Sequence, residues 1–501
     1  MPADGDSSRQ LLGMYRLGGL FLNETEDIKR FPIMIGLLLG GFIAMFSETA
    51  LNIALSSLAK QMDVQMGTIQ WLVIGYLLVV GILLPLSGLL TRWFTTRQLL
   101  VFALSDFIVG AVIAALAPSF GMLLVGRMIQ GIATGIILPL IYLVALSIYP
   151  MDKRGAAMGI IGLVIMFAPA IGPTLSGLIL GALSWQYIFW VMVPLLAIAL
   201  FLTVTYTKNV GEITRPHVDI LSIVESTLGF GGIVIGVSLA SETGWGSWQV
   251  ILSLLVGVVS LALFCQRQLN IDEPILNVRA FGIRNFSVGT GLVMIDFMVI
   301  MSSMYLLPTY WQDGLMVPVA LTGVLMLPGG IINALVSTVA GRLFDRMGGR
   351  RPVIAGFCLA AIGAILLVFT NSSSAYWYVV VAHVILMIGA PLAMSPSQAF
   401  GLGALPPQMA ADGSSIMNTL QQVCGAIATA LSTSLMSSGE AGKRTRDAIS
   451  SGTRMGFMLT LALAIIGVIV ATVFVRQQQA PADVDETSAT QSAGHEAPVE
   501  R

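Results

Sequence analysis

The sequence predicts an all-α polytopic membrane protein, and three observations support this fold class. Hydrophobic residues make up 56% of the 501 residues and charged residues only 10%, whereas a soluble domain carries about 25% charged residues. Runs of about twenty apolar residues, long enough to cross roughly 30 Å of hydrocarbon, recur from Phe31 to Val475. Short polar turns separate these runs. This composition excludes a soluble enzyme.

Reading from one polar turn to the next predicts fourteen transmembrane helices. The first six are Phe31–Leu55, Thr68–Leu90, Gln98–Leu116, Phe120–Ile148, Gly155–Leu183 and Trp185–Tyr206. A pair follows at Ile220–Ala240 and Trp248–Cys265. The last six are Phe286–Tyr310, Val317–Leu343, Val353–Phe369, Ala375–Gly401, Ser414–Met436 and Met455–Val475.

Lysine and arginine gather in alternate loops, which orients the chain in the membrane. With both termini in the cytoplasm, the cytoplasmic loops hold Arg92, Arg97, Lys153, Arg154, Lys208, Arg215, Arg267, Arg279, Arg284, Arg342, Arg346, Arg350 and Arg351. Most opposite loops hold none, and Lys60 is an exception. The basic segment 437–454 is another exception. Either a late span is miscounted or this segment is an external loop, and we favour the external loop.

The expected organisation has five parts. They are a cytoplasmic N-terminal segment (1–30), a six-helix bundle (31–206), an inserted helix pair (219–266), a second six-helix bundle with the external loop (285–476), and a disordered tail (477–501). An internal repeat supports the two bundles, because the turns Gly88–Arg97 and Gly341–Arg350 share the pattern G-x-L-x-x-x-x-x-x-R. Parallel repeats of this kind are found in secondary transporters.

Composition and motifs also exclude several classes of site. A formal net charge of −1 gives no indication of a nucleic-acid partner. Cys265, Cys358 and Cys424 lie far apart in apolar stretches, so we expect neither a disulfide framework nor a metal site. The segment Gly439–Thr445 departs from a phosphate-binding loop, because Ser437 stands in place of its first glycine. We therefore expect no nucleotide, no metal and no catalytic residue, and an ion gradient as the energy source.

Several motifs together resemble the major facilitator superfamily. The turn Gly341–Arg351 is similar to its cytoplasmic loop signature, and Arg127–Gly131 on the fourth span resembles the arginine motif of its proton-coupled members. Ala168–Gly177 on the fifth span is similar to the antiporter motif. Glu48–Leu55 on the first span resembles the acidic motif of the fourteen-span drug:proton antiporters, the EmrB/QacA group. Within that group, Phe46–Ala50 is most similar to lincomycin-resistance-type exporters.

This resemblance implies the superfamily fold and a proton-coupled multidrug efflux antiporter. Its substrates would be lipophilic, often cationic compounds, and its place the bacterial cytoplasmic membrane. The resemblance also implies a monomer without an obligatory adaptor protein and no cofactor besides the coupled proton. The alternative is a dedicated exporter of one endogenous metabolite or lipid, whereas a membrane enzyme or receptor is disfavoured. Arg92 and Thr95 depart from the first-half loop pattern, which has an aspartate and a glycine there.

Glu48 and Arg127 are the first candidates for proton coupling. Charged groups inside a bilayer are costly and are functional candidates by default. Glu48 comes about 14 residues into its span and Arg127 about 8 residues into an antiparallel one, which places them at similar depth at 1.5 Å per residue. Burial and the arginine act on the carboxyl in opposite directions, so its protonation can change between states. The alternative role is a structural ion pair between two helices.

Asp296 lies near mid-depth of the ninth span and is a candidate for either proton coupling or substrate binding. An anion among soft and aromatic side chains suits a lipophilic cation. The substrate-binding candidates are Asp296, Asn52, Gln130, Met298, Tyr305 and Tyr310. A helix-packing hydrogen bond without substrate contact is the alternative role for Asp296.

Gly172, Pro173 and Gly177 belong to the antiporter motif. Small residues allow a close helix contact and proline removes a backbone hydrogen bond, so this stretch either seals the protein against ion leak or only packs.

The turn with Gly341, Asp345, Arg346 and Arg350 is the candidate cytoplasmic gating loop. It either joins the inner ends of the bundles by salt bridges or only follows the excess of basic residues that is usual in cytoplasmic loops.

Glu225 and His383 are secondary candidates. Glu225 is near the cytoplasmic end of the seventh span, where a solvated role is favoured. His383 on the twelfth span has a side chain suited to proton relay, although a lone helical histidine is more often only hydrogen-bonded.

Overall fold

The computed structural model describes residues 30–209, 213, 219–271, 274–406, 409–440 and 445–475, and these residues form helices and short connections. No strand occurs within these ranges. The prediction of an all-α chain is confirmed. Most of the predicted N-terminal segment and the predicted disordered tail, 477–501, lie outside the described residues.

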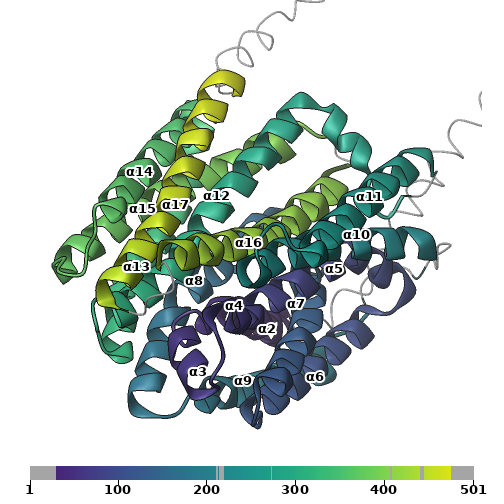
Figure 1. The fold of residues 1–501 in the computed structure, drawn as a ribbon. Coiled ribbons are helices and arrows are strands. Elements are labelled where there is room, and N and C mark those ends of the chain that lie inside the picture. The colour runs from purple at the N-terminus through teal and green to yellow at the C-terminus, as the bar shows by residue number, and fades with distance from the viewer. Residues whose placement is uncertain are drawn as a thin grey trace, which may run out of the picture.

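Helices from the first part of the chain pack together at the lower side of the molecule in Figure 1. They are α2 (Arg30–Ala50), α3 (Leu55–Gln61), α4 (Met66–Ile69), α5 (Trp71–Trp93), α6 (Thr96–Ala115), α7 (Phe120–Ile148), α8 (Met151–Ala182) and α9 (Gln186–Tyr206). Side-chain caps set two of these starts. Thr95 and Gln98 form a capping box at α6, and Ser119 accepts from the Met122 N–H at α7.

Helices α10 (Ile220–Thr243) and α11 (Trp248–Asn270) pack against each other and coincide with the pair that the sequence predicts as an insertion. Asp219 accepts two hydrogen bonds from Arg267, at 2.6 and 2.8 Å, across the ends of the two helices. These bonds lower the pKa of Asp219 to about 2. The carboxylate therefore stays ionised throughout the physiological pH range, and its ion pair with Arg267 persists over that range.

The remaining helices pack together at the upper left of Figure 1. They are η1 (Val278–Gly282), α12 (Arg284–Thr309), the π-helical turn η2 (Tyr310–Gly314), α13 (Val319–Met347), α14 (Arg350–Val368), α15 (Tyr376–Leu402), α16 (Ala410–Glu440) and α17 (Arg446–Phe474). Gly348 ends α13 with φ +72°, a left-handed conformation that favours glycine. This turn joins α13 directly to α14.

Twelve described helices are long and apolar enough to cross a membrane, and a bent pair within α8 raises the number to thirteen. The bend is 43° between Ile160–Pro169 and Ile171–Ala182, where Pro169 and Pro173 lack the N–H groups of a regular helix. The predicted span Ser414–Met436 falls in α16, which is not among these helices. The count of fourteen spans therefore stays a prediction.

Two predicted boundaries differ from the structure. The first predicted span reaches Leu55, but α2 ends at Ala50 and a turn separates it from α3. The predicted external loop, 437–454, is largely helical, because α16 continues to Glu440 and α17 begins at Arg446. Thr445 caps α17 by accepting from the Ala448 N–H, which lets the helix start earlier than hydropathy alone indicates.

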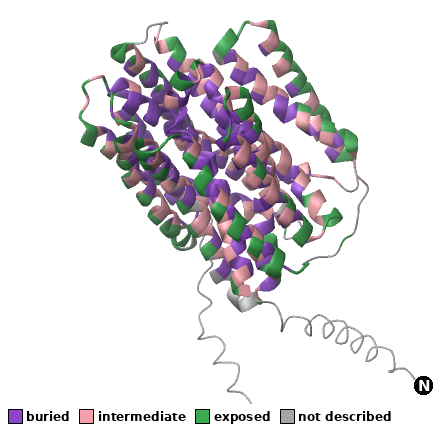
Figure 2. Cartoon of the chain, turned by 90° about the horizontal axis from the view of Figure 1, so that it is seen from below, coloured by how far each residue is buried: buried purple, intermediate pink, exposed green. Residues whose placement is uncertain are grey.

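Buried residues follow the interior of the bundle and exposed residues its periphery, as Figure 2 shows. The exposed side chains include large apolar ones on α11, such as Trp248, Ile251 and Leu255. Apolar exposure of this extent suits contact with lipid. We call the end of the bundle that holds α3, the start of α7 and η2 the distal end, and the opposite end the proximal end.

Candidate functional site

Arg127 lies on α7 with its side chain entirely buried. Its Nη1 donates to Ser47 Oγ at 2.5 Å and to Gln130 Oε1 at 2.8 Å, and its Nε donates to the Leu72 carbonyl at 3.1 Å. The guanidinium also stands 4.2 Å from the ring centre of Tyr76, a cation–π contact. Helices α2, α5 and α7 thus share one buried cation.

Glu48 lies beside this cation on α2, next in sequence to Ser47, and is 4% exposed. In the described part of the chain, ion pairs within 4.0 Å join Lys60 to Asp313 and Arg267 to Asp219, and Glu48 makes no such pair with Arg127. The Gln422 side chain of α16 instead lies beside the Glu48 carboxyl. Glu48 therefore connects the arginine site to the second half of the chain.

Several buried atoms around Glu48 and Arg127 have no protein hydrogen-bond partner. They are Glu48 Oε2, Asn52 Oδ1, Arg127 Nη2, Gln130 Nε2 and Gln422 Oε1. Buried polar groups are nearly always paired, because each unpaired one costs free energy. We call Ser47, Glu48, Asn52, Tyr76, Arg127, Gln130 and Gln422 the central polar cluster. Its open donors and acceptors can take up a proton or a polar group of a substrate.

The antiporter motif on α8 lies against this cluster and against the second half. Gly172 faces Thr49, the residue after Glu48, so closely that a Cβ there would overlap the Thr49 hydroxyl. Further along, a Cβ on Gly177 would lie 2.9 Å from the Cα of Gly323 on α13. Thr174 Oγ1 donates to the Gly323 carbonyl at 2.9 Å. Small residues thus bring α8 against α2 on one side and α13 on the other.

The distal end carries two more contacts between the halves. Lys60 on α3 pairs with Asp313 on η2 at 2.5 Å. Gln312 Nε2 donates to the Ile53 carbonyl at 2.8 Å, in the turn where α2 ends. With the Gly177–Gly323 contact, these bonds close the two halves together at the distal end. We call the Lys60–Asp313 and Gln312–Ile53 contacts the distal latch.

Asp296 lies on α12, fully buried, and neither carboxyl oxygen has a protein hydrogen-bond partner. Neighbouring side chains form a cluster of Phe297, Met301, Met304 and Met394, with Met298 packed against it. Met298 therefore packs with soft and aromatic groups, and Asp296 lies buried on the same helix. An unpaired carboxyl there has open capacity for a proton or a cation.

Tyr305 and Tyr310 lie farther along the same helix and its continuation. Both are buried, but Tyr310 is 14 residues from Asp296, about 21 Å along a helix axis. The Tyr310 hydroxyl donates to the Asn371 carbonyl at 2.7 Å, and its ring packs against Phe457. The structure does not bring Tyr310 together with Asp296.

The chain matches a known protein family over most of its length. The profile of the Major Facilitator Superfamily matches residues 37–429. The chain belongs to the major facilitator superfamily. A solved D-xylose–proton symporter aligns with TM-score 0.67 and 14% identity, covering 90% of this chain and 99% of that one. A solved peptide transporter aligns with TM-score 0.63 and 16% identity, covering 88% and 94%. The superfamily fold predicted from sequence is confirmed.

Relatives with closer sequences agree with the drug:proton antiporter group predicted above. The lincomycin resistance protein LmrB of Bacillus subtilis is 50% identical over 460 residues, which cover 89% of this chain and 96% of that protein. The LmrB of Listeria monocytogenes is 46% identical over 462 residues, covering 90% and 98%. The multidrug export protein EmrB of Escherichia coli is more distant, at 25% over 413 residues, covering 81% and 80%.

Other candidate residues of this superfamily member lie outside the central polar cluster. His383 on α15 is buried against Gly329, and its Nε2 has no protein partner. Glu225 on α10 lies in the electrostatic field of Arg267, away from the cluster.

The candidate gating loop lies at the proximal end. Arg350 donates to the Thr472 carbonyl of α17 at 3.1 Å, whereas Arg346 is exposed and Gly341 has no neighbour within 4 Å of a would-be Cβ. The side chain of Asp345 lies outside the described residues. Among the side chains that the structure describes, no ion pair forms the salt-bridge latch predicted for this loop.

Three residues of the central polar cluster were not predicted from the sequence: Ser47, Tyr76 and Gln422. Ser47 and Tyr76 complete the environment of Arg127, and Gln422 links Glu48 to α16. One available signal was position, because Ser47 is adjacent to Glu48 in an otherwise apolar run. No local sequence feature marks Tyr76 or Gln422 as a member of the cluster, because their positions beside Arg127 and Glu48 depend on which helices pack together.

Proposed function

We propose that this chain exports lipophilic, often cationic compounds in exchange for protons, by alternating access across a bacterial cytoplasmic membrane. The observation that carries the proposal is the buried central polar cluster, in which the carboxyl of Glu48 lies beside Arg127 and reaches the second half through Gln422. The drug-resistance names of the relatives support the same function. The chain would move its substrates without converting them.

The proposed topology has both termini in the cytoplasm, so that the distal end faces outward. The bundles would be two six-helix units, 31–206 and 285–476, with the inserted pair between them. With the distal latch formed, the outer side is closed, and the cluster would be reached from the cytoplasm. A shallow apolar recess of about 110 Å³ between α8 and α13, lined by Phe167, Ile171, Leu327 and Ile331, lies on the proximal side of the Gly177–Gly323 contact.

Protonation of Glu48 is the proposed coupling step. An ionised Glu48 would accept a hydrogen bond from the neighbouring Gln422 and would be attracted to Arg127, so it would hold α16 against α2. A proton on Glu48 weakens both interactions, which favours separation of the halves. A substrate or proton shifts such an equilibrium only through different affinities for the two states.

Asp296 is the proposed cation-binding group for the substrate. Its two carboxyl oxygens are buried without a protein partner, and α12 also carries Met298, Met301 and Met304, whose side chains adapt to apolar surfaces of different shapes. The transporter would work as a monomer, without an obligatory adaptor, and would need only the proton as its coupled ion.

The test is transport by the purified protein in proteoliposomes with an imposed pH gradient. Ethidium serves as a lipophilic cation and lincomycin as the drug named for the relatives. We expect uphill movement of at least one of them that collapses when a protonophore removes the gradient. Transport unaffected by the protonophore would contradict proton coupling. Failure of both compounds and of a wider cation panel would contradict multidrug export.

A further inference from the structure

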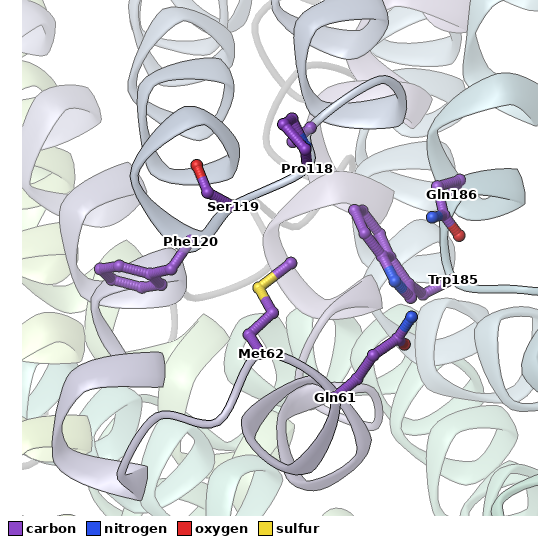
Figure 3. Close-up of a pocket in the computed structure, with 8 residues that line it drawn as sticks. Gln61, Met62, Pro118, Ser119, Phe120, Trp185 and Gln186 are labelled. Atoms are coloured by element: carbon purple, nitrogen blue, oxygen red, sulfur yellow. The ribbon is translucent and has the colours of Figure 1, made fainter.

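A pocket of about 400 Å³ lies at the distal end of the first half, separate from the central polar cluster. Figure 3 shows its lining side chains, which come from three connections between helices. They are Gln61 and Met62 after α3, Ala117 to Phe120 before and within α7, and Trp185 and Gln186 at the start of α9. No lining residue comes from the second half, so this pocket is not part of the path between the halves.

Two buried polar atoms of the lining have no protein partner. Trp185 is only 4% exposed, and its indole Nε1–H makes no hydrogen bond. The side-chain oxygen of the neighbouring Gln186 is also buried without a donor. A buried donor and a buried acceptor that both stay open are costly unless a ligand pairs with them. The wall of the pocket therefore contains one open donor and one open acceptor, on adjacent residues.

The rest of the lining restricts the chemistry of that occupant. Gln61 and Ser119 add an amide and a hydroxyl, Met62 and Phe120 add apolar surface, and no residue of the lining is charged. A charged group would find no countercharge there, which makes its desolvation unfavourable. Hydroxyl groups both donate and accept, so a group with several hydroxyls can pair with an open acceptor such as Gln186 Oε1 and an open donor such as Trp185 Nε1.

We propose that this pocket binds a neutral, hydroxyl-rich group of the sugar or glycerol type. Its volume lies in the range of about 300–1,000 Å³ that is usual for small-molecule sites. Such a group can belong to a free soluble sugar or to the headgroup of a membrane glycolipid. The two sources share the hydroxyl chemistry and differ in the need for a bilayer.

The test uses full-length protein labelled with 5-fluorotryptophan in phosphatidylcholine nanodiscs. The chain has eight tryptophans, and Trp185→Phe identifies the fluorine signal of Trp185 by its disappearance. Methyl α-D-glucoside is the soluble probe, and monoglucosyl diacylglycerol is the lipid probe. We expect the Trp185 signal to shift saturably with at least one probe. A response to the glucoside supports a soluble ligand, and a response to the glycolipid alone supports a headgroup.

The controls separate specific binding from general effects of the probes. Trp190 lies on the same helix at 38% exposure, and its signal, identified with Trp190→Phe, should not shift. Gln186→Leu should weaken the apparent affinity about three- to tenfold, as expected for one lost hydrogen bond. Gln266→Leu, at an exposed position of α11, should leave it unchanged. An unmoved Trp185 signal with both probes, or a non-saturating shift that Trp190 shares, would overturn the proposal.

Discussion

Arg127 shows at the residue scale how this fold tolerates a charge in the bilayer. A buried cation is costly, and here hydrogen bonds to Ser47, Gln130 and the Leu72 carbonyl offset the cost together with the face of Tyr76. Because these neutral groups hold the guanidinium, Glu48 is not needed as its direct partner. The carboxyl is thus free to change protonation without leaving the arginine unsupported.

Glu48→Gln should abolish proton-driven export while preserving the fold. Glutamine keeps the shape and a hydrogen-bond acceptor for Gln422, but it cannot carry or release a proton. We expect pH-gradient-driven uphill transport in proteoliposomes to fall at least about tenfold, with substrate counterflow retained. Glu242→Gln, at an exposed position near the end of α10, is the matched control. Undiminished uphill transport by the Glu48 variant would move the proton site elsewhere, with Asp296 as the next candidate.

Asp296→Asn should separate cationic from neutral substrates. The change deletes the negative charge that a buried, unpartnered carboxyl can carry, so a bound cation loses its countercharge while a neutral compound loses little. We expect export of a monovalent or divalent cation to fall about tenfold or more relative to that of a neutral compound. The measurement is initial export rate for both compound types in the same vesicles. An equal loss for both types would assign Asp296 to the proton path.

At the element scale, two irregular helix ends meet at the distal end. The break between α2 and α3 contains neither proline nor glycine, and its Ile53 carbonyl accepts from Gln312 of η2. The π-helical turn η2 in turn places Asp313 against Lys60. The broken end of α2 with α3 and the π-helical turn η2 therefore provide hydrogen-bonding and charged partners for each other. Helix ends whose polar groups pair across the two halves suit a contact that has to open and close.

Reversing the charges of the distal latch tests this contact. Lys60 is 72% exposed along its side chain, so the pair contributes at most about 1 kcal/mol, or about a fivefold shift in the ratio of closed to open states. We expect Lys60→Asp or Asp313→Lys alone to lengthen the distance between spin labels at Gln65 and Ala375, two exposed distal positions. The double swap should restore the shorter distance.

Spin-label distances measured by double electron–electron resonance decide the outcome. Arg279→Asp, an exposed charge change near η1, serves as a control that leaves the distal distance unchanged. A double swap no better than either single change would show that the ion pair does not hold the distal end closed.

At the scale of the whole molecule, membrane orientation is open to direct measurement. Ser451 lies exposed on α17, about one and a half turns from its distal start. In a variant that lacks Cys265, Cys358 and Cys424, Ser451→Cys should react with an impermeant thiol reagent added to intact cells. Phe94→Cys, at the exposed proximal end of α5, should react only after the membrane is opened. The reverse pattern would place the termini outside and contradict the proposed topology.

The helices and their approximate bounds were predictable because a membrane imposes a strong local rule. A span needs a long apolar run, and each charge within one is conspicuous, so Glu48, Arg127 and Asp296 could be selected before any contact was known. Boundaries set by tertiary contacts were not predictable. The first predicted span ran on to Leu55, because the hydropathy of Leu51–Ala54 is that of a continuing helix.

Hydropathy and charge are properties of short segments, so the helical membrane fold, the superfamily motifs and the ionisable groups within apolar runs can be read from the sequence alone. Three features become known only from the packed helices: Ser47 and Tyr76 hold Arg127, Gly177 meets Gly323, and three connections form the pocket at Trp185. These contacts join residues that are far apart in the chain. Their geometry depends on how whole helices pack, and packing is set by the combined shape of many side chains rather than by any local pattern.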